Sequence, residues 1–180
     1  MFKQIKFLIA IGLWFMIVSC GNDDNNREED LPQNIYEGCC STEPVFGPNI
    51  DNLDQTAGEI EVYTIVTQNG DGINDLFSIR NIELYPNHSV TIYNAENEQI
   101  FQSTNYVNGT DFFPGYPQDE DNGANGIPNG TYRYKLVIEN EETYRKSGSF
   151  CVYTWIDEAP NFEGCNLGTE FDPIIAFPPN

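Results

Sequence analysis

Four of the five cysteines, those that follow Cys20, constrain the fold of this chain more than any other feature of its sequence. Cys39 and Cys40 are adjacent, whereas Cys151 and Cys165 lie near the far end of the chain. An even number of cysteines in an exported chain indicates disulfide bonds, and a bond between direct neighbours would close a strained ring. We therefore expect Cys39 and Cys40 each to pair with Cys151 or Cys165, which joins the segment before the main domain to the segment after it. In the chain-entropy model a loop of this length stabilises the fold by roughly 4 to 5 kcal/mol.

The start of the chain predicts export and attachment of lipid. Lys3 and Lys6 form a basic start, and an apolar run follows at residues 7–18 (FLIAIGLWFMIV). This run is too short to cross a bilayer as a stable helix and is typical of a secretory signal. It ends in Ile-Val-Ser-Cys, which resembles the bacterial lipobox. We expect a signal peptide at residues 1–19 and acyl chains on Cys20 that anchor the protein to the outer membrane.

Residues 20–34 predict a flexible acidic tether. The stretch GNDDNNREEDLPQN has no aromatic or β-branched residue, so it cannot bury enough apolar surface to fold. Its Asn-Asp-Asp at positions 22–24 resembles the acidic export signal of Bacteroidetes lipoproteins, which implies exposure on the cell surface. A solvated linker without an export role is the alternative.

The charge and the motifs exclude several classes of protein. With 8 Lys and Arg against 28 Asp and Glu, the net charge is -20, and phosphate backbones would repel such a chain. No nucleic-acid partner is therefore expected. His88 is the only histidine and is expected to be a surface residue. No nucleophile motif, phosphate-binding loop or histidine metal cluster is present, and the chain is predicted not to be an enzyme.

The middle of the chain predicts short antiparallel strands. Polar turns with Asn-Gly and Asp-Gly separate the apolar stretches, and Thr131–Ile138 alternates tyrosine, leucine and isoleucine with arginine and lysine. Strands are expected at residues 59–66, 89–94, 99–102, 131–138 and 144–155. The pattern is all-β and indicates an antiparallel sandwich.

Four ordered motifs in this region resemble a known family. They are TQNGDGINDLF at residues 67–77, YPNHSVTIYN at 85–94, QIF at 99–101 and IPNGTYRY at 127–134. Together they resemble the gliding motility-associated C-terminal domain, the type B sorting domain of the type IX secretion system in Bacteroidetes. The resemblance implies an immunoglobulin-like β-sandwich over residues 59–155.

The chain departs from the family pattern in three places. Ala-Glu-Asn replaces the Arg-Trp-Gly of the family at residues 95–97, no tryptophan occupies the Trp-Asp-Gly segment, and residues 118–125 look like an acidic insertion. Members of the family end soon after the last strand, whereas an extension at residues 156–180 follows here. Together with the lipoprotein route that the start of the chain predicts, this extension favours a retained module over a cleaved secretion tag. A cysteine-containing lead-in is expected at residues 35–58.

Two clusters of oxygen-bearing side chains invite a calcium interpretation, because such oxygens bind a hard cation. The first is in the loop at residues 67–75 and comprises Asn69, Asp71, Asn74 and Asp75. The alternative is a turn whose Asn-Gly and Asp-Gly supply positive φ angles. The second, at residues 119–122, is interpreted as a solvated loop. Zinc on the cysteines is disfavoured because the adjacent pair lacks the two-residue gap of a zinc knuckle. No cofactor is therefore required.

These observations predict a non-enzymatic surface lipoprotein whose immunoglobulin-like domain binds a protein partner in type IX secretion or gliding motility. One alternative is a sugar-binding or adhesive module, which requires an exposed aromatic platform near residues 106–116. Its candidate aromatics are Tyr85, Tyr93, Tyr106, Phe112, Phe113 and Tyr116. The other alternative is a secretion cargo that carries a sorting domain.

Overall fold

The computed structural model describes residues 34–111, 113, 127–139, 143–154, 162, 164–168 and 172–176. All of them belong to the compact unit Asn34–Asn180. The predicted signal peptide, Cys20 and all but the last residue of the predicted tether lie outside the described residues. Within this part of the chain, no helix has the length and apolarity to span a membrane.

The described part is nearly all β-structure, as predicted. A 3₁₀ turn, η1 (Ile82–Leu84), and a short helix, α1 (Pro173–Ala176), are the helical elements among these residues. The strands are β1 (Ile50–Asp51), β2 (Glu61–Val62), β3 (Ile65–Val66), β4 (Ile79–Arg80), β5 (His88–Tyr93), β6 (Gln99–Thr104), β7 (Gly130–Glu139) and β8 (Thr143–Val152).

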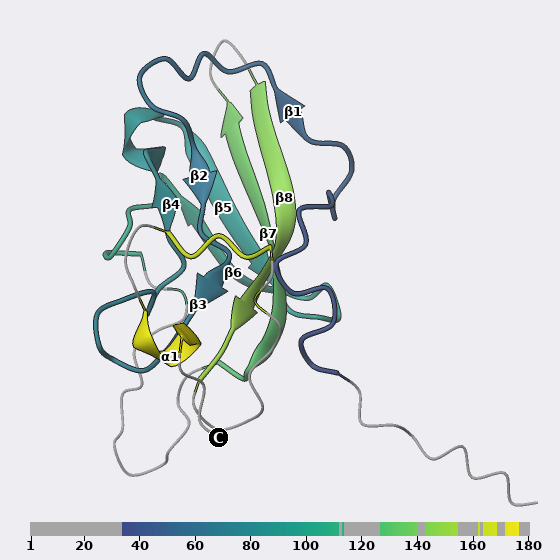
Figure 1. The fold of residues 1–180 in the computed structure, drawn as a ribbon. Coiled ribbons are helices and arrows are strands. Elements are labelled where there is room, and N and C mark those ends of the chain that lie inside the picture. Colours follow the sequence, from purple (N-terminus) through teal and green to yellow (C-terminus); the bar gives the residue numbers. More distant parts are fainter. Residues whose placement is uncertain are drawn as a thin grey trace, which may run out of the picture. The chain divides into compact units, whose positions relative to one another are not determined.

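The strands form two sheets (Figure 1). The larger sheet has the order β1-β8-β7-β5-β6, and β3 also pairs with β8; the smaller sheet pairs β2 with β4. The pairings are antiparallel except for β3 with β8, which is parallel. The arrangement agrees with the immunoglobulin-like sandwich that the sequence predicts.

A two-residue period places one face of β5, β7 and β8 in the core. Tyr132, Tyr134, Leu136 and Ile138 are all buried, as their alternation predicts. Residues from the smaller sheet, including Val62 and Ile79, belong to the same apolar cluster, so the two sheets share one core. Aromatic rings fill its centre, where the ring centroids of Phe77 and Phe150 lie 4.7 Å apart.

The edge of β8 that faces away from β7 is closed by several short segments. Alternate backbone N–H groups of β8 and of the residue that follows it all find acceptors at 2.9–3.0 Å along this edge. Ser147 donates to Asn49 Oδ1, Ser149 to Ser41 O, Cys151 to Thr64 O and Tyr153 to Val66 O. The four acceptors lie at residues 41, 49, 64 and 66, so this edge depends on segments of the chain outside β7 and β8. An edge closed in this way is protected from pairing with another chain.

The strand predicted at residues 59–66 is wrong in one respect. It forms β2 and β3, which belong to different sheets: β2 pairs with β4 and β3 with β8. The chain changes sheet at Tyr63 and Thr64, where the Thr64 N–H donates to Asn166 O at 2.9 Å. The other predicted strands are confirmed within a few residues, although β8 ends at Val152 and not at residue 155.

Candidate functional site

The signature loop, residues 67–75, is the most distinctive local structure of the domain. Gly70 and Gly72 have φ angles of +77° and +89°, as the predicted turn requires. Their N–H groups donate to the two carboxylate oxygens of Asp75, at 2.8 Å for Gly70 and 2.7 Å for Gly72. Asp75 therefore organises the loop by binding its backbone.

The other predicted calcium residues of the signature loop lie in the same hydrogen-bonded turn. Asp71 accepts from the Ile73 N–H at 2.8 Å and from the Asn69 side-chain amide at 3.0 Å. Asn74, with φ +53°, turns its side-chain amide away toward the C-terminal extension. The oxygens of Asp71 and Asp75 thus have hydrogen-bond donors from the protein. The second predicted cluster, at residues 119–122, lies outside the described residues.

A buried carboxylate from the C-terminal extension closes the signature loop. Asp172 is 4 % exposed, and its Oδ2 accepts from Thr67 Oγ1 at 2.6 Å and from Asn74 Nδ2 at 3.2 Å. Its Oδ1 accepts from the Ile174 N–H at 3.1 Å, at the start of α1. One side chain therefore ties α1 to the loop that carries the first family motif.

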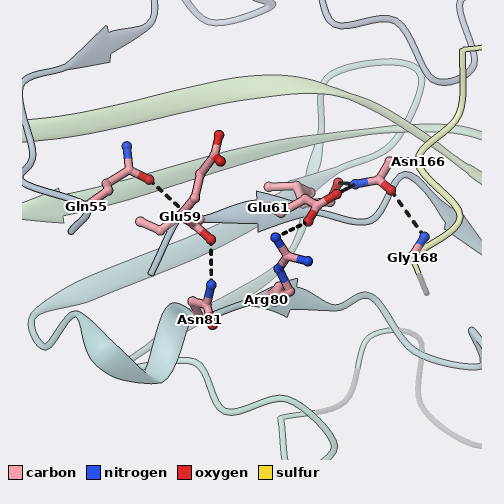
Figure 2. Close-up of polar contacts among 9 residues, drawn as sticks. Gln55, Glu59, Glu61, Arg80, Asn81, Asn166 and Gly168 are labelled. Atoms are coloured by element: carbon pink, nitrogen blue, oxygen red, sulfur yellow. Dashed lines mark hydrogen bonds and ion pairs between the residues drawn. The ribbon is translucent and has the colours of Figure 1, made fainter. Parts of the chain in front are cut away.

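A second part of the extension runs beside β2 (Figure 2). The Asn166 side-chain amide donates to Glu61 Oε1 at 2.9 Å and to Val62 O at 3.1 Å. Glu61 also forms an ion pair with Arg80 of β4 at 2.8 Å, so Asn166 reaches both strands of the smaller sheet through one carboxylate. The Asn166 N–H in turn donates to Thr64 Oγ1 at 2.8 Å.

The cysteines form two disulfides that cross between the two ends of the described chain. Cys39 pairs with Cys151 of β8, and Cys40 pairs with Cys165 of the extension. The sequence left this choice open, because both pairings join the same segments. Three of the sulfur atoms, those of Cys39, Cys40 and Cys151, lie within 4.8 Å of one another. Lead-in, last strand and extension are therefore joined covalently at one place.

A family comparison identifies the domain on which these segments meet. Residues 60–152 match the model of the CHU_C type IX secretion signal domain, and the match covers just over half of the chain. The chain belongs to the CHU_C type IX secretion signal domain family. Comparisons with curated proteins and with solved structures gave no match. Membership links the protein to type IX secretion and to secretion or display at the cell surface, and a CHU_C signal domain is not itself catalytic.

His88 of the CHU_C domain is a structural residue, and the expectation that it lies on the surface is wrong. The imidazole is 5 % exposed. Its Nδ1 lies 2.6 Å from Tyr85 O and its Nε2 lies 3.0 Å from Tyr106 O. The ring thus links the segment before β5 to the segment after β6.

The exposed aromatic platform expected near residues 106–116 is not found among the described aromatics of that segment of the CHU_C domain. Tyr85, Tyr106 and Phe113 are each at most 5 % exposed. Tyr106 donates its hydroxyl to Phe77 O, and burial raises the pKa of that hydroxyl well above its usual range. Tyr93 is half-buried against Phe46. Phe112 and Tyr116 lie outside the described residues.

Sequence reasoning did not single out Asp172 and Asn166, which hold the extension on the CHU_C domain. Neither residue lies in a motif, and in an acidic chain one more aspartate is not distinctive. The one signal in the extension was Cys165, whose predicted disulfide already required this segment to return to the domain.

Proposed function

We propose that this protein is a non-enzymatic, surface-exposed lipoprotein of the outer membrane. In this proposal its immunoglobulin-like CHU_C domain is retained in the mature protein as an interaction module of type IX secretion or gliding motility. The observation that supports retention is the double disulfide from the lead-in to β8 and to the extension.

The disulfides oppose release of the domain by proteolysis. A cut between Cys40 and residue 60 would leave the lipid-bearing piece joined to the domain by both bonds. A cut between Val152 and Cys165 would leave the extension attached through Cys40. A sorting domain that is removed as a tag has no need of such bonds, whereas an anchored module is stabilised by them.

The lead-in adds polar and aromatic contacts to the same attachment. The N–H groups of Val45 and Phe46 donate to Ser147 Oγ of β8 at 3.1 Å and 3.3 Å. The ring of Phe46 packs on Tyr93 with centroids 4.4 Å apart. Residue Ile35 contributes its carbonyl to the Thr131 N–H of β7 at 2.9 Å. The segment that follows the predicted tether is thus built into the domain.

Retention is tested by immunoblotting outer membranes with antibodies against the lead-in and against the extension. We expect both antibodies to detect one band of the same size on reducing and on non-reducing gels. Two bands under reduction that merge without reduction would show a cut chain held by disulfides, and loss of the extension from both gels would establish the secretion-cargo alternative.

The anchor is tested by labelling cells with an alkyne palmitate analogue. The full chain should take up the label, and Cys20→Ser should abolish it and release the protein from the membrane. Cys165→Ser is the matched control, because it removes another exported cysteine and should keep the label. Label retained by Cys20→Ser would contradict lipidation at this residue.

The interaction role is tested by crosslinking on intact cells followed by purification of the full chain. Recovery of a component of the type IX secretion or gliding apparatus would support the interaction role. This recovery should be lost when the sample is heat-denatured before crosslinking. Recovery of abundant porins alone would overturn it.

A further inference from the structure

The outer face of the larger sheet carries a hollow of about 610 Å³. It lies over β6, β5 and β7, on the opposite side of the sheet from the core. Its volume is within the usual range of small-molecule sites, which is about 300 to 1,000 Å³. Most of the lining is neutral and polar, with hydroxyl and amide side chains from β5 and β6, whereas β7 contributes Lys135, Val137 and Glu139.

The strand register arranges this lining in rows. In the middle row Lys135 of β7 stands opposite Thr91 of β5, and Thr91 stands opposite Gln102 of β6. In the next row Ser89 stands between Val137 and Thr104. Because successive side chains of a strand alternate between faces, these residues share the outer face while Val90 and Ile92 enter the core.

Among the described residues that line the hollow, Lys135 is the one lysine, and none is an arginine. The chain as a whole has a net charge of -20. Its side chain is half-buried, and no carboxylate in the described part of the chain forms an ion pair with it. Glu139, the acid in the lining, is four residues further along β7, which corresponds to about 13 Å of extended strand. Among the described residues, the hollow therefore offers one lysine side chain that forms no ion pair.

The backbone under the hollow is not available to a ligand. Strand β5 is paired on both sides, with β6 and with β7, so its N–H and C=O groups are used in the two ladders. A bound peptide is usually held by backbone pairing at a sheet edge. Over β5 recognition must therefore come from side chains, and backbone pairing remains open only along the outer edge of β6. The hydroxyl and amide side chains match the closely spaced hydroxyls of a sugar.

An aromatic ring borders the hollow at one end. Tyr93 lines it and is held against Phe46 with ring centroids 4.4 Å apart. A fixed, half-buried ring gives an apolar edge against which the C–H face of a pyranose can pack. Hydroxyls and amides in the floor, one ammonium in the middle and a ring at the end suit a saccharide that carries a carboxylate.

We propose that this hollow binds an acidic polysaccharide, with Lys135 binding a uronate carboxylate and Thr91 and Gln102 binding sugar hydroxyls. The site is distinct from the signature loop and from the disulfides. It gives the protein a ligand outside the secretion machinery, such as an anionic glycan at a bacterial surface.

The test uses the purified full chain and three probes at an ionic strength of about 0.15 M, where repulsion by distant acids is screened. The probes are alginate, alginate whose carboxyl groups have been reduced to alcohols, and poly-glutamate. Calorimetric titration should detect alginate, with reduced alginate binding roughly tenfold more weakly, because an ion-assisted hydrogen bond is lost. Equal binding of the two alginates, or poly-glutamate binding as tightly as alginate, would overturn the proposal.

Two matched variants locate the site. Lys135→Gln should weaken alginate binding by about tenfold and leave the weak binding of reduced alginate unchanged. Lys146→Gln makes the same charge change on β8 opposite Leu136, whose side chain enters the core, so it faces away from the hollow. It should change binding by less than about twofold.

A third variant tests the hydroxyl row. Thr91→Val keeps the shape and removes the hydroxyl, so it should weaken both alginates by a similar factor. Thermal midpoints of all three variants should match that of the parent chain. If the three variants remain folded and bind alginate equally well, the proposal is wrong.

Discussion

The CHU_C domain and the segments that flank it are held in different ways. Residues 60–152 contain most of the large apolar cluster, in which Phe77, Leu136 and Phe150 are fully buried. The lead-in and the extension meet the domain through two disulfides, through Asp172 and Asn166, and through the smaller cluster around Cys40 and Cys151. The signal domain thus has a core of its own, whereas the flanking segments are held on it by disulfides, hydrogen bonds and smaller apolar contacts.

The largest effect is expected from emptying the core of the domain. Phe150→Ala should lower the free energy of unfolding by about 3 to 5 kcal/mol, because it leaves a cavity among packed rings. Phe46→Ala removes the same side chain from the lead-in, where it contacts Tyr93, and should cost about 1 kcal/mol. Urea unfolding followed by circular dichroism measures both. Equal losses would remove the distinction between core and flank.

Loss of the disulfide to the extension is expected to be next in size. Cys40→Ser with Cys165→Ser should cost about 2 to 5 kcal/mol. Hydrogen exchange should then show faster exchange at the Thr64 and Asn166 amides, which bond across this contact, than in β7. Uniform acceleration through β7 and β8 would show that domain and flank unfold as one unit.

High pH should destabilise the core before it affects the flanks. Burial raises the pKa of Tyr134 to about 12, and burial together with nearby Glu96 raises that of Tyr132 to about 12. The unfolded value is near 10, so the neutral phenols favour the fold fully below pH 10, and this stability is lost as pH rises toward 12. The urea midpoint should fall over the same pH range in which the tyrosinate absorbance rises. Ionisation of all tyrosines near pH 10 in a folded chain would contradict this.

A smaller effect is expected at the link between the signature loop and α1. Asp172→Asn leaves one acceptor oxygen in place of two for the three donors that Asp172 binds. It should lower the free energy of unfolding by about 1 to 2 kcal/mol. Hydrogen exchange should increase at the Ile174 amide and in residues 67–75. Asp71→Asn is the control, because its contacts lie within the loop and are exposed. An Asp172→Asn chain with unchanged exchange at Ile174 would argue against the link.

The smallest effect is expected from removing divalent cations. Both carboxylate oxygens of Asp75 accept backbone N–H groups, so donors of the protein already hold the turn of the signature loop. EDTA should leave the melting temperature unchanged, since a cation that binds only the native state would raise it. A rise on adding calcium that Asp75→Asn abolishes would restore the calcium interpretation.

Local patterns predicted the domain well because they depend on neighbours in the sequence. The alternation in β7 placed its tyrosines in the core, and the glycines of the signature loop predicted its positive φ angles. The same reasoning failed at residues 59–66, where a continuous apolar run contributes to two sheets. A run of apolar residues predicts that the segment is buried, but it does not predict which strand the segment pairs with.

The site depended on distant contacts, and these were accessible to prediction only in part. Cys165 indicated that the extension returns to the domain, but Asp172 and Asn166 carry no such signal. His88 was expected on the surface because a lone polar residue beside a turn is usually exposed; two carbonyl oxygens brought together from separate segments bury it instead.

By itself the sequence determined the all-β class, the strand-forming stretches, the turn of the signature loop and the membership of a secretion family. Each of these follows from short-range periodicity, from turn chemistry or from a linear motif. The tertiary structure decided which cysteines pair, that the extension closes the signature loop, and that Lys135, Thr91 and Gln102 form one row across three strands. These features depend on register and on chain return, which bring together residues that no local pattern relates.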